Sequence, residues 1–136
     1  QMPEYVVEKT AEALNDDEKS VKGSNIIVVG LAYKPNVDDT RETPAAEIIE
    51  LLAQRGAKVS YHDPHVPSFP NMRNYKFDMH SVPLDAGTLG GADCVVIVTD
   101  HAVTDWQAIA DHAKLVIDTR NAMAHIENPN ARIVKA

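Results

Sequence analysis

The chain has 136 residues, a length that suits one domain with a substantial hydrophobic core. Hydrophobic residues make up 44% of it and charged residues 24%, which is typical of a globular protein. Its formal net charge of −7 argues against a surface for nucleic acid or for an anionic membrane, since both need a basic face. No apolar run reaches the roughly 18–20 residues that span a bilayer. A single cysteine, Cys94, excludes an internal disulfide and favours a cytoplasmic protein.

Segments with helical and strand-like patterns alternate along the chain. A first helix is expected over residues 3–14, followed by a polar linker at 15–20. Strands are then predicted at 25–29, 58–61, 76–80, 94–98, 115–117 and 132–134, with helices at 44–55, 83–91 and 105–113. Strands that alternate with helices form right-handed crossovers. The pattern therefore predicts an α/β fold: residues 21–136 form a three-layer, Rossmann-like domain with a mainly parallel sheet, preceded by a short N-terminal helix and linker at 1–20.

The loop after the first predicted strand carries the strongest functional signal. The apolar strand ends at Gly30, and the loop that follows contains Lys34 and Arg41 before Thr43 and Pro44 begin a helix. In an open α/β sheet, loops at the carboxyl ends of strands line the ligand crevice. Cations placed there, close to the N–H groups of a helix terminus, suit a phosphate group.

Other predicted strands end in polar residues that should share this edge. They are His62 and Asp63, then Thr99, Asp100 and His101, and finally Asp118, Arg120 and Asn121. Together, Lys34, Arg41 and Arg120 would favour a diphosphate. The competing interpretation is that these loop residues are polar because loops are solvated. Solvation of the loops explains any single one of these residues well, but it explains the three cations together less well.

Three other kinds of site are disfavoured. Gly30 is followed by Leu31-Ala32-Tyr33, so the G-x-G-x-x-G pattern of a dinucleotide site is absent. Asp63 stands where an acidic residue would bind the ribose of NAD, but without the glycines we place no NAD in this crevice. His62 and His65 form a conceivable metal-ligand pair, but loop histidines without a metal are the better interpretation. Cys94 lies within an apolar run and reads as a small buried hydrophobe rather than a reactive thiol.

Several motifs match one enzyme family. They are residues 30–34 (GLAYK), 38–44 (DDTRETP), 61–64 (YHDP), 92–101 (ADCVVIVTDH), 118–121 (DTRN) and 2–7 (MPEYVV). The set resembles the carboxyl-terminal, UDP-binding domain of the UDP-glucose/GDP-mannose dehydrogenase family, with residues 2–7 resembling the end of its central, dimerising helix. The bacterial branch acting on UDP-N-acetylglucosamine or UDP-N-acetylmannosamine is the most similar.

The resemblance implies a role for each cation. Tyr33 and Lys34 would contact the nucleotide-sugar, Arg120 would bind UDP, and Arg41 would reach toward NAD held by an amino-terminal domain. Family members oxidise a sugar C6 hydroxyl to a carboxylate with two NAD, supplying hexuronate for surface polysaccharide, and usually form homo-oligomers. Their nucleophilic cysteine lies in the amino-terminal half. We therefore expect this chain to be the carboxyl-terminal portion of such an enzyme and inactive by itself, with UDP-sugar and the amino-terminal domain as partners.

A second function class stays open at this point. The chain could be a non-catalytic α/β module that binds a nucleotide or a protein as a regulator. The combination of Tyr33, Lys34, Arg41 and Arg120 favours the enzyme. The reading frame upstream of Met2 would discriminate between the two, because a dehydrogenase would carry G-x-G-x-x-G and a glycine-flanked cysteine there.

Overall fold

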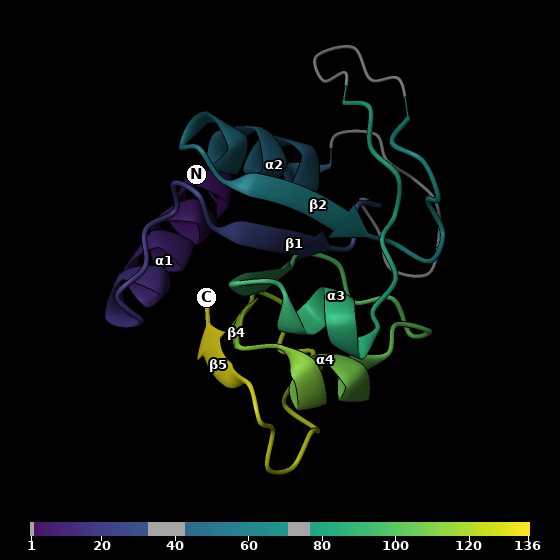
Figure 1. The fold of residues 1–136 in the computed structure, drawn as a ribbon. Coiled ribbons are helices and arrows are strands. Elements are labelled where there is room, and N and C mark those ends of the chain that lie inside the picture. The colour runs from purple at the N-terminus through teal and green to yellow at the C-terminus, as the bar shows by residue number, and fades with distance from the viewer. Residues whose placement is uncertain (1, 33–42, 71–76) are drawn as a thin grey trace.

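The computed structural model describes residues 2–32, 43–70 and 77–136. Within these ranges, five parallel strands form one sheet in the order β2-β1-β3-β4-β5 (Figure 1). The helices are α1 (Met2–Asp16), α2 (Pro44–Gln54), α3 (Ala86–Gly90) and α4 (Trp106–His112). The strands are β1 (Asn25–Val29), β2 (Lys58–His62), β3 (Cys94–Ile97), β4 (Leu115–Asp118) and β5 (Arg132–Lys135).

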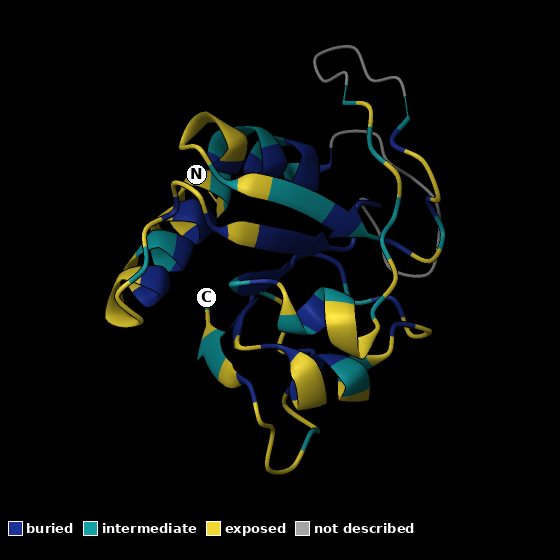
Figure 2. Cartoon of the chain, viewed as in Figure 1, coloured by how far each residue is buried: buried dark blue, intermediate teal, exposed yellow. Residues whose placement is uncertain are grey.

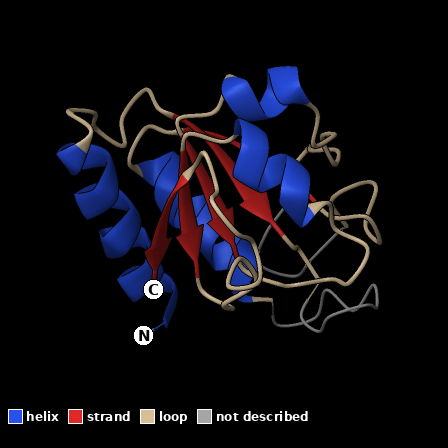
Figure 3. Ribbon diagram, turned by 90° about the horizontal axis from the view of Figure 1, so that it is seen from below, coloured by secondary structure: helices blue, strands red, loops and turns tan. Residues whose placement is uncertain are grey.

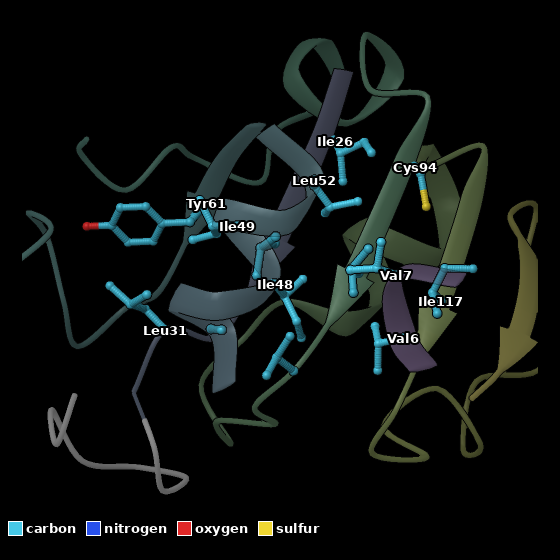
Figure 4. Packing of buried hydrophobic residues seen from close by; sticks show 14 of the residues in the cluster. Val6, Val7, Ile26, Leu31, Ile48, Ile49, Leu52, Tyr61, Cys94 and Ile117 are labelled. Atoms are coloured by element: carbon cyan, nitrogen blue, oxygen red, sulfur yellow. The ribbon is translucent and has the colours of Figure 1, made fainter. Parts of the chain in front are cut away.

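Helices cover both faces of the sheet, so the molecule has three layers (Figure 3). Alternate residues of β1 point to opposite faces, as the pleat of a strand requires. Ile26 and Val28 pack in a cluster with α1 and α2, whereas Ile27 and Val29 pack in a second cluster with α3 and α4. Figure 4 shows part of the first cluster, where side chains from α1, α2 and the sheet meet.

The central strands are buried on both faces and the edge strands are not. Every residue of β3 and β4 is buried, while β2 and β5 are largely half-buried or exposed (Figure 2). This explains why β3 and β4 read as continuous apolar runs in the sequence. The predicted α/β, Rossmann-like fold is confirmed.

One predicted strand is wrong where it can be checked. A strand was expected at 76–80, but the described residues 77–82 form only isolated bridges, one between Ser68 and His80 and one between Tyr61 and Ser81. Pro67 and Pro83 flank this pairing and lack the N–H groups that a longer ladder would need. The first helix also extends beyond its predicted end, to Asp16.

In the ranges described, no helix combines the length and the apolar character that crossing a membrane requires.

Candidate functional site

The carboxyl ends of the five strands meet at one edge of the sheet, because all five are parallel. The strand order reverses direction between β1 and β3, which is the point where open α/β sheets form their ligand crevice. The loops after these two strands, beginning at Gly30 and Val98, therefore define the centre of the candidate site.

Gly30 lets these two loops touch. Its φ is +94°, and a Cβ on this residue would lie 2.5 Å from the Thr99 carbonyl oxygen and 2.6 Å from Thr99 Cβ. Thr99 Oγ1 in turn donates to the carbonyl of Ala32 at 2.7 Å. Only glycine allows this approach, since it has no side chain and tolerates positive φ.

Asp63, just after β2, connects three of the loops at this edge. Its side chain is buried, and Oδ2 accepts hydrogen bonds from the backbone N–H groups of Leu31 (2.8 Å) and Ala32 (2.9 Å). The same oxygen accepts from His101 Nε2 at 2.9 Å, and Oδ1 accepts from the His65 N–H at 2.8 Å. One carboxylate thus joins the segments that follow β1, β2 and β3.

These contacts keep the carboxylate ionised. Burial raises the pKa of Asp63, but the N–H groups of Ala32 and His65 and the His101 ring outweigh burial and hold the pKa below its usual range. An ionised carboxylate only accepts, so His101 Nε2 must carry the proton in this pair. His101 is fully buried, and its ring meets the His65 ring edge to face with centroids 4.6 Å apart.

A second aspartate organises the loop after β4. Buried Asp118 accepts hydrogen bonds from the N–H groups of Arg120 (3.0 Å), Ala122 (3.1 Å) and Met123 (2.9 Å). This loop leaves the Arg120 side chain half-exposed, with Nε donating to Asp100 Oδ1 at 3.1 Å. Arg120 therefore reaches from β4 toward the loop after β3.

An open hollow of about 470 Å³ adjoins Arg120. It is lined by Asp118, Thr119, Arg120, Asn121, Lys135 and Ala136. Lys135, at the end of β5, adds a second cation, which the sequence patterns do not indicate. Its position could have been inferred only from the pairing of β5 beside β4, where Lys135 lies opposite Asp118.

The structure describes one of the four sequence-predicted site residues. Arg120 lies at the predicted edge, whereas Tyr33, Lys34 and Arg41 lie outside the described residues. Both flanks of that stretch are anchored here, because Thr43 Oγ1 donates to the Leu31 carbonyl at 2.6 Å and caps α2 by accepting from the Ala45 N–H. The meeting of Lys34 with Arg120 stays a prediction.

The described part of the crevice does not fit a dinucleotide. In such a site, free backbone N–H groups after the first strand face the pyrophosphate. Here the N–H groups of Leu31 and Ala32 are taken by Asp63, and the space beside Gly30 is filled by Thr99. The N–H groups of Leu31 and Ala32 are therefore not free to bind a phosphate.

Nor do the described ranges contain a group of three or more residues arranged to hold a metal ion. Of the histidines considered as ligands, His62 contacts the Val82 carbonyl through Nδ1 at 2.7 Å, and His65 packs on His101.

Comparison with known proteins agrees with this architecture. Residues 27–125 match the family model described as "UDP-glucose/GDP-mannose dehydrogenase family, UDP binding domain". A UDP-N-acetyl-D-mannosamine dehydrogenase of Methanococcus vannielii is 31% identical over 134 residues, covering 91% of this chain. A UDP-glucose 6-dehydrogenase of Rickettsia bellii is 34% identical over 128 residues, covering 89% of it.

Among solved structures, the UDP-D-ManNAc dehydrogenase of Pyrococcus horikoshii superposes with a TM-score of 0.73 at 29% identity. The match covers 98% of this chain and 30% of that one. The chain likewise spans 28% of the length of the two curated relatives named above.

Proposed function

The chain belongs to the UDP-glucose/GDP-mannose dehydrogenase family, and from this membership we propose that it is the UDP-sugar-binding portion of an NAD-dependent nucleotide-sugar 6-dehydrogenase. The observation that carries the proposal is the family match over residues 27–125, which spans β1 to the loop containing Arg120. The edge of the sheet described above is where this domain would hold the nucleotide.

Its task would be to anchor the nucleotide so that the distant sugar is oriented for oxidation. Lys34 and Arg120 would contact the diphosphate or nearby oxygens, with Tyr33 beside them, and charge-assisted hydrogen bonds of this kind are among the stronger ones in proteins. Binding energy from the nucleotide then fixes the position of the sugar C6 hydroxyl. NAD, held mainly by an amino-terminal domain, would accept the two hydrides that conversion of the hydroxyl to a carboxylate releases, and Arg41 would reach toward it.

The proposed substrate is a UDP-N-acetylhexosamine. Relatives named as UDP-N-acetyl-D-mannosamine dehydrogenases and as UDP-glucose 6-dehydrogenases both match, and the motifs at residues 2–7 and 62–67 favour the former. We further propose that residues 1–20 are the end of a central helix and its linker, that the whole enzyme is a cytoplasmic homo-oligomer, and that its product serves surface polysaccharide synthesis.

Calorimetric titration of the chain with UDP tests nucleotide binding. We expect weak binding, because the rest of the pocket would come from another domain. Arg120→Ala and Lys34→Ala should each weaken it by about 1.5–3 kcal/mol, the usual contribution of a hydrogen bond to a charged group. Lys58→Ala is the matched control, because Lys58 is an exposed cation at the start of β2, on the opposite edge. If Arg120→Ala and Lys34→Ala both bound UDP as tightly as the wild type, the assigned site would be contradicted.

Activity requires a separate experiment on the longer protein that includes the amino-terminal domain. With UDP-N-acetylhexosamine it should reduce NAD, whereas the 136-residue chain should not. Arg41→Ala should disturb NAD use more than UDP-sugar affinity. If the 136-residue chain binds UDP but the longer protein does not reduce NAD, the regulatory module is favoured instead.

A further inference from the structure

We propose that Lys135 is a further binding residue of the nucleotide site, and that together with Arg120 it binds the phosphate groups of UDP. Both side chains line the open hollow of about 470 Å³ beside the carboxyl ends of β4 and β5. The proposal rests on the function proposed above, and it concerns a residue to which the family resemblance assigned no role.

The pairing of β5 with β4 places Lys135 beside the loop that follows β4. Lys135 lies opposite Asp118, the last residue of β4, in the register of these parallel strands. Side chains of a strand alternate between the two faces of the sheet. Val134 packs in the cluster with α1 and α2, and Ile133 packs in the cluster with α3 and α4. Lys135 therefore shares the face of Ile133, which is also the face on which the loop after β4 packs through Met123.

Both cations have hydrogen-bond donors that the protein does not use. Arg120 Nε donates to Asp100 Oδ1 at 3.1 Å, but neither Nη atom of Arg120 has a partner among the described residues. The ion pair thus holds the guanidinium in place while its terminal N–H groups stay available. Lys135 is exposed, and its Nζ makes no hydrogen bond or ion pair with the part of the chain that the structure describes. Guanidinium and ammonium groups with unused donors suit phosphate oxygens.

The negative charge at this hollow is already bound within the protein. Among the described residues that line the hollow, only Asp118 is acidic, and its buried carboxylate accepts the N–H groups of Arg120, Ala122 and Met123. The hollow therefore has an excess of positive charge in a chain whose formal net charge is −7. Such an excess attracts an anionic group, and in UDP the negative charge is on the diphosphate.

Lys135→Gln in the 136-residue chain tests the proposal. Glutamine keeps a polar side chain but removes the charge, and the fold should persist because Lys135 is exposed. In about 0.1 M salt we expect UDP affinity to fall on the order of fivefold, since an exposed charge contributes less than a buried one. Lys135→Arg keeps the charge and should bind within about twofold of the wild type. Amide NMR titrations measure these affinities, and the signals of Asn121 and Lys135 should shift as UDP binds.

Lys114→Gln is the matched control, because it removes the same charge at the opposite end of β4. Lys114 is exposed and directly precedes the strand. Its Cα lies roughly 13 Å along the strand from that of Asp118. This exceeds the screening length of about 10 Å in 0.1 M salt, so UDP affinity should change less than about twofold. If Lys114→Gln weakened binding as much as Lys135→Gln, the loss would reflect net charge alone and the role of Lys135 would be refuted.

Inorganic pyrophosphate tests which part of UDP the two cations bind. It should shift the same amide signals in the wild type, and Lys135→Gln should weaken its binding by a factor similar to that for UDP. No shift in the wild type, or equal pyrophosphate affinity of the wild type and Lys135→Gln, would overturn the phosphate contact.

Two further outcomes separate this proposal from the proposed function. If Arg120→Ala weakened UDP binding while Lys135→Gln bound like the wild type, Lys135 would have no part in the site and the proposed function would stand. If the wild-type chain did not bind UDP at all, the proposed function would be overturned, and the role of Lys135 with it.

Discussion

Two buried aspartates have the same local task at the site edge. Asp63 follows β2 and Asp118 ends β4, and each accepts N–H groups of the residues just after it. Loop N–H groups that would otherwise lack partners away from water are thereby satisfied. In both cases the carboxylate shapes the backbone at this edge: Asp118 shapes the loop that carries Arg120, and Asp63 holds Leu31 and Ala32 after β1.

Cys94 illustrates the opposite case, a reactive residue type placed where it cannot react. It is fully buried in β3, and burial raises the pKa of its thiol strongly. We expect no reaction with a thiol reagent such as 5,5′-dithiobis(2-nitrobenzoic acid) at pH 8 in the native chain and complete reaction in guanidinium chloride. Rapid labelling of the folded chain would show that Cys94 is accessible, contrary to the structure.

Sequence reasoning placed the polar residues at the right edge but did not pair them. The patterns located Asp63 and His101 after different strands, 38 residues apart. Their contact depends on the order β2-β1-β3, which brings both ends next to the β1 loop. No local pattern encodes that order, so Asp63 was predicted at this edge without His101 as its partner. Asp118 directly follows the apolar residues Leu115, Val116 and Ile117, which is a signal for a buried carboxylate, whereas the polar strand β2 gives no such signal for Asp63.

At the scale of elements, the β1 loop and the β3 loop are joined through Gly30, and this contact can be tested. Gly30→Ala combines a positive φ with a Cβ 2.5 Å from backbone atoms of Thr99. The two effects together should lower the free energy of unfolding by roughly 2–5 kcal/mol. Urea unfolding of purified variants measures it.

Gly23→Ala separates the two effects. Gly23 also has a positive φ, +85°, but a Cβ there would meet nothing within 4 Å. This variant should show only the backbone strain, about 1–2 kcal/mol. Equal losses in the two alanine variants would mean that the contact between Gly30 and Thr99 contributes nothing.

The more completely a strand is buried, the more accurately the sequence predicts where it begins and ends. Strands β3 and β4 were located within one residue because both faces are covered and the sequence is uniformly apolar. Helix α2 was located from its cap, since Thr43 accepts from the Ala45 N–H and Gly56 follows its end. Residues 77–80 alternate between half-buried and exposed side chains, a period of two that is typical of a strand, yet they take part only in an isolated bridge, so the strand predicted at 76–80 is wrong in its described part.

For the molecule as a whole, α1 is part of the core. Its residues Val6, Val7, Ala13 and Leu14 are buried against the sheet and α2. Its last turn is held from the other end of the chain, because Arg132 of β5 donates to the Ala13 carbonyl at 2.9 Å and to Asp17 at 3.0 Å. Contacts at its buried face and at its last turn thus fix α1 to the rest of the domain.

Leu14→Ala tests that attachment. Leu14 is fully buried, so its truncation should lower the free energy of unfolding by about 2–5 kcal/mol, the usual cost of a cavity in a core. Tyr5→Ala is the control on the same helix, because Tyr5 is 51% exposed and its loss should change stability by less than about 1 kcal/mol. Urea unfolding gives both values. A small effect of Leu14→Ala would mean that α1 is only loosely docked on the sheet and α2.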